Sequence, residues 1–477
     1  MIPELRPYQQ DAMDRVRHAL TLHRRVLLSA PVGAGKTIVA CAMIRAALAK
    51  GRRVLFLVHR RELLQQAHDR LAAFGIDAGI IIRSTHRLRP ATVASVQTLV
   101  RRELPPADLI FVDEAHRSVA PTFKQVLSVY QKAWIVGLSA TPYRLDGKGL
   151  SEQFDSLVTS VTTADLIRDG YLVQPIVYSP GCPDVSRIPK RHGDFATGPL
   201  AEAASPLTGD VLKHWLRLAE NRPTVAFCVN LAHAAHVAET FRNVGIPATS
   251  IAGSDADREH KLAQLRTGHT KVLASVDLLG EGWDFPELSC AILARPTASL
   301  SVHHQQIGRV LRTFPGKNGA LILDHAGNHD RLGAIDDPIT LNLEGVTRQA
   351  VPRILTCPKC FAAYRLAPCP QCGHEPEPSP IAEETLPRST DDELQRYTKQ
   401  DREGFYRTLV LQAFRKRQSL GTARHAYRAR FKVWPRHSEI ERLYVCTEHE
   451  PQDLTFGPRR VTRCRLCLQA LPRASTR

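Results

Sequence analysis

Short apolar runs alternate with segments of helical spacing from residue 26 to about residue 325. Apolar runs without polar interruption are typical of strands buried on both faces of a parallel sheet. A first series of such runs spans 26–30, 54–58, 109–113 and 134–139. A second series spans 224–229, 271–275, 290–294 and 320–324. The two series predict an α/β protein with two tandem lobes, each built on a parallel sheet.

Changes in composition predict the domain boundaries. The lobes are assigned to 1–172 and 173–345. The segment 180–205, rich in Pro, Gly and charge, is predicted to be a loop or connector on the second lobe. A cysteine cluster follows at 346–378, then a linker rich in proline and acidic residues at 379–394, and then a basic module at 395–477 whose first part has helical spacing. The chain is therefore expected to carry two small appendages after its second lobe.

Charge and hydropathy narrow the class of function. The formal net charge is +17 and the isoelectric point is about 9.6, which favours a polyanionic partner. We find no run of eighteen apolar residues, so we expect no membrane partner. Residues 1–8 lack the apolar core of a secretory signal, so we expect a cytoplasmic protein.

A glycine-rich loop lies between the first predicted strand and a predicted helix. Residues 30–37 read Ala-Pro-Val-Gly-Ala-Gly-Lys-Thr, the phosphate-loop pattern with Ala30 in place of its first glycine. Small residues such as Gly33 and Gly35 let backbone N–H groups approach phosphate oxygens. Lys36 is expected to reach the β- and γ-phosphates of ATP and Thr37 to bind Mg²⁺. A plain glycine turn is the alternative interpretation.

Two carboxylates end the third predicted strand. Residues 109–116 read Leu-Ile-Phe-Val-Asp-Glu-Ala-His, which places Asp113 and Glu114 at the carboxyl edge of the sheet, where ligands bind. Asp113 is expected to hold Mg²⁺, and Glu114 to position and polarise the attacking water. An ordinary acidic loop is the alternative.

Together, the phosphate loop and the Asp-Glu-Ala-His motif resemble the DEAD/DEAH-box class of superfamily 2 helicases, in the branch of type III restriction-like and RadD-like proteins. The resemblance covers about residues 5–325. It implies two RecA-like lobes, with Gln9 reading adenine and His116, Ser139 and Thr141 coupling hydrolysis to movement. It also implies that Arg60, Arg61, Gln97 and Thr98 of the first lobe contact a nucleic-acid strand.

The second lobe continues the resemblance. Residues 276–286 resemble the fifth helicase motif and assign Asp284 to the nucleotide site, and residues 305–312 resemble the sixth. By this likeness Arg309 and Arg312 act as arginine fingers on the γ-phosphate, with Gln305 among the coupling residues. The spacing of the two arginines predicts one helix face for both. Asn230 and His233 follow a predicted strand, and each is either a nucleic-acid contact or a helix cap or surface group.

Cysteine spacing predicts a zinc site after the second lobe. Cys357, Cys360, Cys369 and Cys372 form two Cys-x-x-Cys pairs, which in a reducing compartment indicate a zinc ribbon. Thiols without metal are the alternative. A second group could hold Zn²⁺ or form a redox-sensitive pair, and its members are Cys446, His449, Cys464 and Cys467. The basic module around it could contact DNA or protein partners, or simply pack its aromatic residues in a small core.

The motifs favour an ATP-dependent helicase or translocase, with DNA favoured over RNA as its track and repair or recombination as its setting. ATP, Mg²⁺ and Zn²⁺ are the expected cofactors. The motor subunit of a restriction or nuclease system and an RNA helicase remain alternatives. A nucleic-acid-binding scaffold without ATPase activity is disfavoured because the ATP motifs are complete. The sequence leaves open the polarity of movement, the choice between unwinding and translocation, and the oligomeric state.

Overall fold

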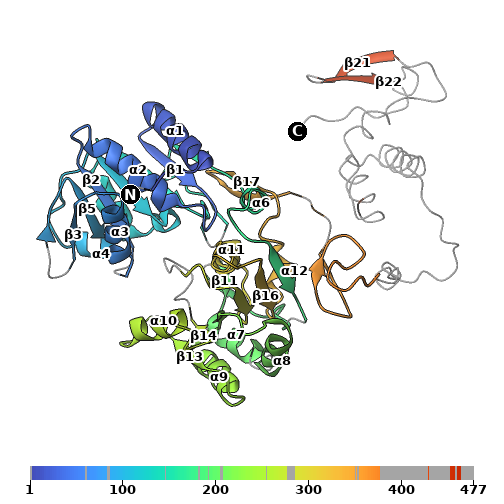
Figure 1. The fold of residues 1–477 in the computed structure, drawn as a ribbon. Coiled ribbons are helices and arrows are strands. Elements are labelled where there is room, and N and C mark those ends of the chain that lie inside the picture. The colour runs from blue at the N-terminus through green and yellow to red at the C-terminus, as the bar shows by residue number, and fades with distance from the viewer. Residues whose placement is uncertain are drawn as a thin grey trace. The chain divides into compact units, whose positions relative to one another are not determined.

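The computed structural model describes residues 3–375 apart from 60–61, 83–85, 145–146, 181–182, 192, 205–207, 254, 277–284, 350 and 352–353, together with 428, 452–456 and 459–463. The chain divides into two compact units, Met1–Ser379 and Pro380–Arg477. Figure 1 shows the first unit with its blue to cyan elements in one lobe and its green to yellow elements in another. The two units are described separately.

The first lobe is built on an eight-stranded sheet of order β4-β3-β5-β2-β6-β7-β1-β8. All neighbouring strands are parallel except β3 and β4, which are antiparallel. The strands are β1 (Arg25–Ser29), β2 (Val54–Val58), β3 (Ala78–Ile81), β4 (His86–Arg87), β5 (Ala91–Ser95), β6 (Leu109–Asp113), β7 (Trp134–Ser139) and β8 (Ser156–Thr159). The helices are α1 (Pro7–Leu22), α2 (Lys36–Leu48), α3 (Glu62–Ala73), α4 (Val96–Leu99) and α5 (Pro121–Val129), with a short 3₁₀ helix, η1 (Ala115–Arg117).

Successive side chains of the central strands enter two different cores. Val26 and Leu28 pack in the cluster that includes residues of α1, α2 and α3, whereas Leu27 packs in the cluster that includes residues of α4 and α5. Side chains along a strand alternate between faces, and both faces are covered here. This explains why the strands read as apolar runs without polar interruption.

The second lobe is built on a six-stranded parallel sheet of order β13-β14-β12-β15-β16-β9. The strands are β9 (Pro175–Tyr178), β12 (Thr224–Phe227), β13 (Ala248–Ile251), β14 (Val272–Ser275), β15 (Cys290–Leu293) and β16 (Ala320–Asp324). The helices are α6 (Thr163–Arg168), α7 (Thr197–Ala204), α8 (Thr208–Leu218), α9 (Leu231–Arg242), α10 (Arg258–Arg266), α11 (Leu300–Gly308) and α12 (Asn328–Leu332). The expectation of two parallel α/β lobes is therefore confirmed, and each of the eight sequence-predicted strands has a counterpart within two residues.

The segment 180–205 is more ordered than predicted. It contains a two-stranded sheet of β10 (Lys190–Arg191) and β11 (Asp194–Phe195), followed by α7. Buried Asp194 anchors the segment, because its Oδ1 accepts hydrogen bonds from Thr297 Oγ1 at 2.9 Å and from the Ala298 N–H at 2.7 Å. The prediction of a loop or connector did not include these strands and this helix, because Pro, Gly and charge mark turns but do not report such distant partners.

After the second lobe the chain returns to the first. A hairpin of β17 (Ile339–Asn342) and β18 (Gly345–Arg348) meets the segment that follows β7, where Lys148 forms an antiparallel bridge with Gly345. The N–H groups of Gly149 and Leu150 donate to the carbonyls of Glu344 and Leu343 at 2.9 and 2.8 Å. The Leu343 side chain packs against a core cluster of the first lobe. The hairpin therefore ties the end of the second lobe to the first.

The cysteine-rich segment is attached to the edge of the second sheet. It contains a short pair, β19 (Leu355–Thr356) and β20 (Ala363–Tyr364). The Ser179 N–H donates to the Phe361 carbonyl at 2.9 Å, and Ala362 forms a bridge with Tyr178 at the end of β9. The ring of Phe361 meets His214 of α8 at 5.7 Å between centroids. The segment is thus docked on the lobe through both backbone and side chains.

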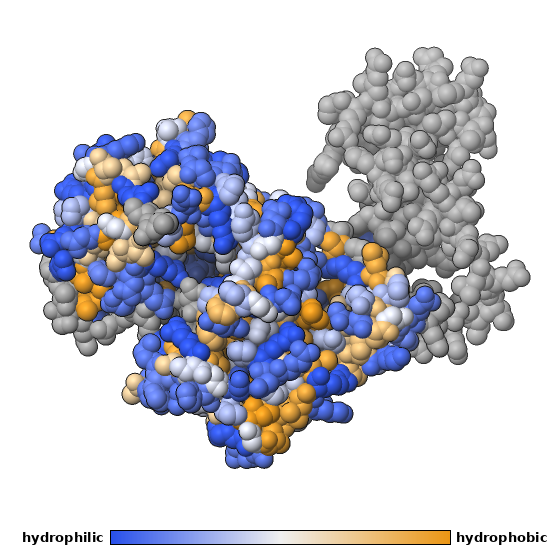
Figure 2. Space-filling model, in the orientation of Figure 1, coloured by the Kyte–Doolittle hydropathy of each residue, from blue (hydrophilic) through white to orange (hydrophobic). Residues whose placement is uncertain are grey.

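In the second unit the structure describes a hairpin of β21 (Gln452–Phe456) and β22 (Arg459–Arg463), and Arg428 in a helix. The predicted linker at 379–394 and nearly all of the basic helical segment lie outside the described residues. Within the described part of the chain, no helix is both long and apolar enough to span a membrane. Figure 2 shows hydrophilic side chains over much of the visible described surface, with apolar patches between them.

Candidate functional site

The phosphate loop connects β1 to the start of α2. Gly33 and Gly35 have φ angles of +88° and +81°, a conformation that favours glycine. A Cβ on Gly35 would overlap the amide nitrogen of Gln9, and one on Gly33 would lie 2.9 Å from the Leu172 side chain. The glycines are therefore required by both backbone conformation and close packing. Gly35 precedes α2, so the N-terminus of this helix, which favours an anion, lies at the loop.

Lys36 lies among charges of both signs. Its Nζ donates to the carbonyls of Ala30 and Pro31 at 3.1 and 3.4 Å. Desolvation by burial lowers its pKa, while the carboxylates of Glu114 and Asp113 act in the opposite direction. The ammonium of the phosphate loop therefore faces the acidic pair at the end of β6, as expected from the meeting of strand ends at one sheet edge.

Asp113 ends β6, and Glu114 follows with a φ of +49°, which is unusual for a residue with a side chain. Burial of the carboxyl and the charge of Glu114 raise the pKa of Asp113 to about 6, although Lys36 lowers it. Glu114 Oε2 is buried, accepts no hydrogen bond from the described residues, and lies 3.5 Å from His116 Nδ1. A buried carboxylate oxygen without a donor suits a group that orients water.

A chain of polar contacts runs from the acidic pair to the second lobe. His116 Nδ1 lies 3.2 Å from Ser139 Oγ, which donates to the Thr141 carbonyl at 2.8 Å. Thr141 Oγ1 lies 2.7 Å from Ser301 Oγ on α11, and Gln305 Nε2 donates to the same oxygen at 3.5 Å. The structure thus brings together the coupling residues expected from sequence. Ser301 completes the chain but was not among them.

Arg309 and Arg312 lie at the phosphate loop but not on one helix. α11 ends at Gly308, Arg309 is its C-terminal cap, and Arg312 forms an antiparallel bridge with Leu172. The Val173 N–H donates to the Leu311 carbonyl at 2.8 Å, which holds this stretch extended. The prediction of a shared helix face was wrong because periodicity does not register a distant backbone partner.

Arg309 and Arg312 nevertheless lie close enough to Lys36 for their charges to affect its pKa. Each contributes to lowering the Lys36 pKa, after burial as the main cause. A Cβ on Gly308 would lie 2.5 Å from Val32 Cβ, and a Cβ on Gly33 would lie 3.7 Å from Arg312 Cγ. The arginine-bearing turn of the second lobe is therefore packed against the phosphate loop of the first.

Gln9 is fixed beneath the phosphate loop. Its Nε2 donates to the Ala34 carbonyl at 3.0 Å and its Oε1 accepts from the Arg6 N–H at 3.0 Å. The neighbouring Tyr8 hydroxyl donates to the same carbonyl at 3.1 Å. Adenine recognition by Gln9 stays a prediction. The geometry shows that its amide links α1 to the loop.

The candidate nucleic-acid contacts fall into two groups. Gln97 and Thr98 lie on α4, where the Gln97 side chain is exposed and its Oε1 accepts from Ser95 Oγ at 2.7 Å. Asn230 is the N-terminal cap of α9, with its Oδ1 accepting from the His233 N–H at 2.8 Å. The cap interpretation of Asn230 is thus confirmed. Two further candidate contacts, Arg60 and Arg61, lie outside the described residues. The same is true of Asp284, which the sequence assigned to the nucleotide site.

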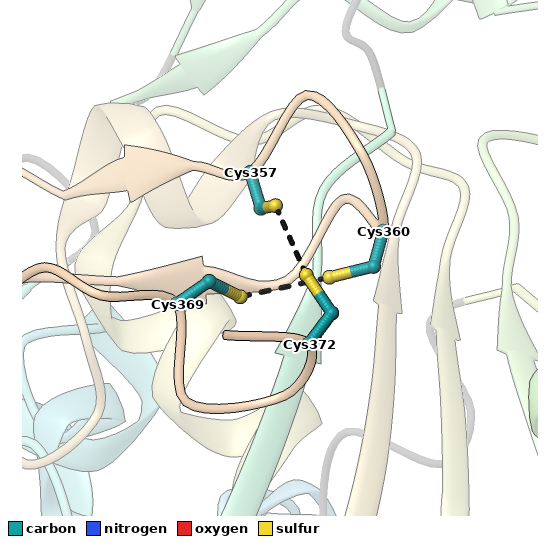
Figure 3. A group of neighbouring side chains, drawn as sticks. All are labelled: Cys357, Cys360, Cys369 and Cys372. Atoms are coloured by element: carbon teal, nitrogen blue, oxygen red, sulfur yellow. Dashed lines mark hydrogen bonds between the residues drawn. The ribbon is translucent and has the colours of Figure 1, made fainter. Parts of the chain in front are cut away.

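Four thiols converge in the segment docked on the second lobe (Figure 3). The sulfurs of Cys357, Cys360, Cys369 and Cys372 all lie within 4.8 Å of one another, with two separations of 3.6 Å. Tetrahedral zinc with Zn–S bonds of about 2.3 Å would place its sulfurs about 3.8 Å apart. Burial raises the pKa of Cys357, but hydrogen bonds from the backbone N–H groups of Cys360 and Lys359 and from the thiols of Cys372 and Cys360 together lower that pKa to about 6. The donor set and spacing fit zinc.

The second candidate zinc group lies outside the described residues. Its members are Cys446, His449, Cys464 and Cys467. The hairpin between the two pairs is described, but the ligands themselves are not. This zinc site stays a prediction.

Sequence reasoning missed Arg70 at the nucleotide site. Arg70 lies near the end of α3, and its guanidinium donates to Thr37 Oγ1 at 3.1 Å. Its charge also acts on the carboxyl of Asp113. No motif marked this position, because a helical arginine far along the chain looks like any surface cation. Only the packing of the lobe shows which residues it meets.

The fold and the site together define a two-lobed P-loop ATPase. Residues 2–144 match the family "Type III restriction enzyme, res subunit", and residues 209–314 match "Helicase conserved C-terminal domain". The chain belongs to the superfamily 2 helicases, which hydrolyse ATP, in the branch that includes restriction-enzyme motors.

Proteins of several kinds are similar in sequence to about 70% of this chain. The chain is 28% identical over 360 residues to the 51.5 kDa protein of a Lactococcus phage (isolate 7-9), covering 73% of this chain and 78% of that protein. It is 31% identical over 376 residues to irc3 of Schizosaccharomyces pombe, described as a mitochondrial ATP-dependent helicase, covering 71% of this chain but 60% of that protein. It is 27% identical over 416 residues to the type I restriction enzyme EcoKI endonuclease subunit of Escherichia coli K12, covering 70% and 35% of the two chains.

Solved structures agree on the fold. A fragment of an HsdR-type subunit of a type I restriction enzyme from Vibrio vulnificus YJ016 has a TM-score of 0.53 and 23% identity, covering 69% of this chain and 66% of that one. The type ISP restriction-modification enzyme LlaBIII bound to DNA has a TM-score of 0.51 and 17% identity, covering 67% and 28% of the two chains. These likenesses show a shared fold over about two thirds of this chain.

Proposed function

We propose that this chain is an ATP-driven motor that translocates along DNA or unwinds it, in a repair or recombination setting. One observation carries the proposal. After burial, the charges of Arg309 and Arg312 of the second lobe lower the pKa of Lys36 of the first, and Gly308 packs against Val32, so both lobes contribute groups beside the phosphate loop. A nucleotide held between them would stabilise the closed arrangement, and its hydrolysis would weaken the bridge.

The polar chain from Glu114 to Ser301 supports the coupling of hydrolysis to movement. His116, Ser139 and Thr141 connect the acidic pair to α11 through contacts of 2.7 to 3.5 Å. A change at Glu114 on hydrolysis can therefore alter the hydrogen bond between the lobes. We propose this chain as the route by which the two events are linked.

The cofactor that fits the acidic edge is Mg²⁺. The hydroxyl of Thr37 and the carboxylate of Asp113 are hard oxygen donors of the kind Mg²⁺ prefers. Both lie beside Lys36 and Arg70, groups that suit a triphosphate. When bound, Mg²⁺ would neutralise charge developing on the phosphates. Lys36 would then hold the phosphates and Glu114 the attacking water.

DNA is proposed as the track because the relatives include restriction enzymes, and the basic charge of +17 suits any nucleic acid. The test compares ATP hydrolysis without nucleic acid and with single-stranded, double-stranded and forked DNA, using RNA as the control. We expect DNA to stimulate turnover and RNA to do so weakly. Equal or greater stimulation by RNA would reject DNA as the track.

The same assay with Lys36→Ala tests the motor itself. We expect this variant to lose turnover while still binding DNA, because the ammonium contacts phosphate groups of ATP and not the track. Turnover at the level of the unaltered protein would reject the assignment of the phosphate loop.

A second candidate function is the motor subunit of a restriction or nuclease system. The match of residues 2–144 to the res subunit of type III restriction enzymes favours it. The two candidates differ in their need for a partner. Full DNA-stimulated turnover by the purified chain alone favours the independent helicase, whereas turnover that appears only with a methylation or recognition subunit favours the restriction motor.

We propose that Cys357, Cys360, Cys369 and Cys372 hold a structural Zn²⁺. Their segment contacts Tyr178 and Ser179 of the second lobe, so zinc would also support that lobe. Cys372→Ser should lose the metal and lower the melting temperature, whereas Leu366→Ser, at a side chain 77% exposed in the same segment, should do neither. Purified protein without stoichiometric zinc, whose stability resists chelators, would contradict the proposal. We also propose that the C-terminal module contacts protein partners. We propose the cytoplasm as the place where the protein works.

A further inference from the structure

The guanidinium of Arg70 lies next to Thr37, one of the two proposed Mg²⁺ ligands. Arg70 lies on α3, and its side chain is half-buried between that helix and the start of α2. Its Nη1 donates to Thr37 Oγ1 at 3.1 Å. Thr37 is the residue whose hydroxyl oxygen is proposed to bind Mg²⁺. The arginine therefore uses a lone pair of the oxygen that the metal requires.

The same guanidinium acts on the second proposed ligand. Burial and Glu114 raise the pKa of Asp113, while the charges of Lys36 and Arg70 lower it. Burial also raises the pKa of Cys41 on α2, again with an opposing effect from Arg70. These effects place the charge of Arg70 near both the carboxylate of β6 and the first turns of α2. The charge of Arg70 therefore lies near both proposed metal ligands, Thr37 and Asp113.

Arg70 cannot act as a metal ligand itself. A guanidinium has five donors and no acceptor and stays charged at any physiological pH. Its hydrogen bond uses one of the two lone pairs of the Thr37 oxygen, and its fixed positive charge repels a divalent cation at that oxygen. ATP brings negative charge that can offset this repulsion. A divalent cation that binds together with ATP would therefore be repelled less by Arg70 than a cation that binds alone.

We propose that Arg70 is a positioning residue that holds the Thr37 hydroxyl before the nucleotide binds, and that its charge opposes a divalent cation there until Mg²⁺ enters together with ATP. It lowers the affinity of the protein for metal alone and so makes metal binding dependent on the nucleotide. This inference rests on the proposed function, since it assumes that Thr37 and Asp113 hold the metal.

The test measures binding of Mn²⁺, as a spectroscopic substitute for Mg²⁺, to the full chain by electron paramagnetic resonance without nucleotide. Arg70→Gln keeps an N–H donor but removes the charge. It should bind Mn²⁺ about tenfold more tightly, the ratio that about 1.4 kcal/mol of removed repulsion gives. Arg70→Lys keeps the charge and should stay within about threefold of the unaltered protein. Arg17→Gln, which removes an exposed arginine from α1 of the same lobe, is the matched control.

A second measurement separates this role from direct contact with the phosphates. ATP binding is followed by fluorescence titration in EDTA and again with Mn²⁺. The inference expects Arg70→Gln to retain ATP binding in EDTA and to lose most of the nucleotide dependence of metal binding. Unchanged Mn²⁺ affinity together with weaker ATP binding in EDTA would identify Arg70 as a phosphate ligand and overturn the inference.

The result also distinguishes failure of this inference from failure of the proposed function. If the unaltered protein binds ATP and Mn²⁺ together but Arg70→Gln binds Mn²⁺ no more tightly, the proposed ATPase stands and the role of Arg70 is rejected. If no variant binds Mn²⁺ with ATP, both are rejected. Circular dichroism of each variant confirms folding, and Arg70→Met provides a second uncharged variant if Arg70→Gln does not fold.

Discussion

Gly308 marks the point where the second lobe presses on the phosphate loop. A Cβ there would lie 2.5 Å from Val32 Cβ and 2.9 Å from its Cγ1, so even alanine requires the two segments to separate. Arg309 follows immediately along the chain. A side chain at this single position should therefore change the distance between the arginines and Lys36 without entering the core of either lobe.

We expect Gly308→Ala to lower the turnover number for ATP about tenfold or more, because a catalytic group displaced by about an ångström loses much of its effect. Steady-state kinetics with saturating ATP and DNA measure the change. Gly198→Ala, at a position with no atom within 4 Å of the added Cβ, should leave turnover unchanged. A double variant with Val32→Gly should regain part of the loss. Undiminished turnover in Gly308→Ala would show that the contact is not needed for hydrolysis.

At the residue scale, motif chemistry predicted the groups whose spacing is local. Lys36 and Thr37 begin a helix after a glycine loop, and Glu114 follows a buried strand, so sequence places them correctly. Arg70 and Ser301 were missed because their partners, Thr37 and Thr141, are distant in the chain. Such contacts depend on how helices pack, and helical spacing alone does not report them.

At the element scale, the hairpin of β17 and β18 connects the end of the second lobe to the first. Its turn pairs with the backbone of Gly149 and Leu150, and Leu343 inserts against the core behind the first sheet. Motion of the lobes must therefore either bend this connection or break it. The hairpin is placed to limit how far the lobes separate.

Leu343→Asp should release the hairpin, since a carboxylate would be placed against an apolar core. We expect a loss of about 1–3 kcal/mol in the free energy of unfolding, and a wider distribution of distances between fluorophores attached to the two lobes. Thr347→Asp, at an exposed position on β18, provides the control on the same hairpin. If single-molecule energy transfer gave identical distributions for both variants, the hairpin would not restrain the lobes.

Eight strands of the two large sheets were predictable because burial on both faces produces apolar runs, as in β2 and β15. The strands β3, β4, β5, β8, β9 and β13 and the hairpin of β10 and β11 were not predicted. The hairpin depends on partners such as Thr297, which binds Asp194 from a hundred residues away along the chain. The end of α11 was misplaced for the same reason, because the Leu311 carbonyl pairs with Val173.

At the scale of the whole molecule, acid should weaken the second lobe through its buried histidines. His303, His325 and His329 are all buried, and burial lowers the pKa of His325 to about 3 and of His329 to about 4. The unfolded chain binds these protons below about pH 6.5, whereas the folded lobe does not until the pH approaches the lowered values. The contribution of these histidines to the free energy of unfolding is therefore complete above about pH 6.5 and is lost as the pH falls.

Urea unfolding followed at pH 7 and at pH 5 tests this expectation. The midpoint should be lower at pH 5, because each histidine that stays neutral in the folded lobe but is protonated in the unfolded chain costs about 1.4 kcal/mol of stability for every pH unit below its unfolded pKa. Zinc content is measured at each pH, because loss of metal would act in the same direction. A midpoint that stays constant or rises at pH 5 with zinc retained would contradict the proposed effect of the histidines.

The central claim concerns the whole molecule: one ATP site is completed by groups from both lobes. Its most direct measurement is single-turnover hydrolysis by Arg309→Ala, with ATP binding measured in parallel. Since the guanidinium is proposed to stabilise charge that develops during hydrolysis, we predict ATP affinity within about threefold of the unaltered protein and a hydrolysis rate reduced about a hundredfold or more. A rate within twofold of the unaltered protein would contradict the account.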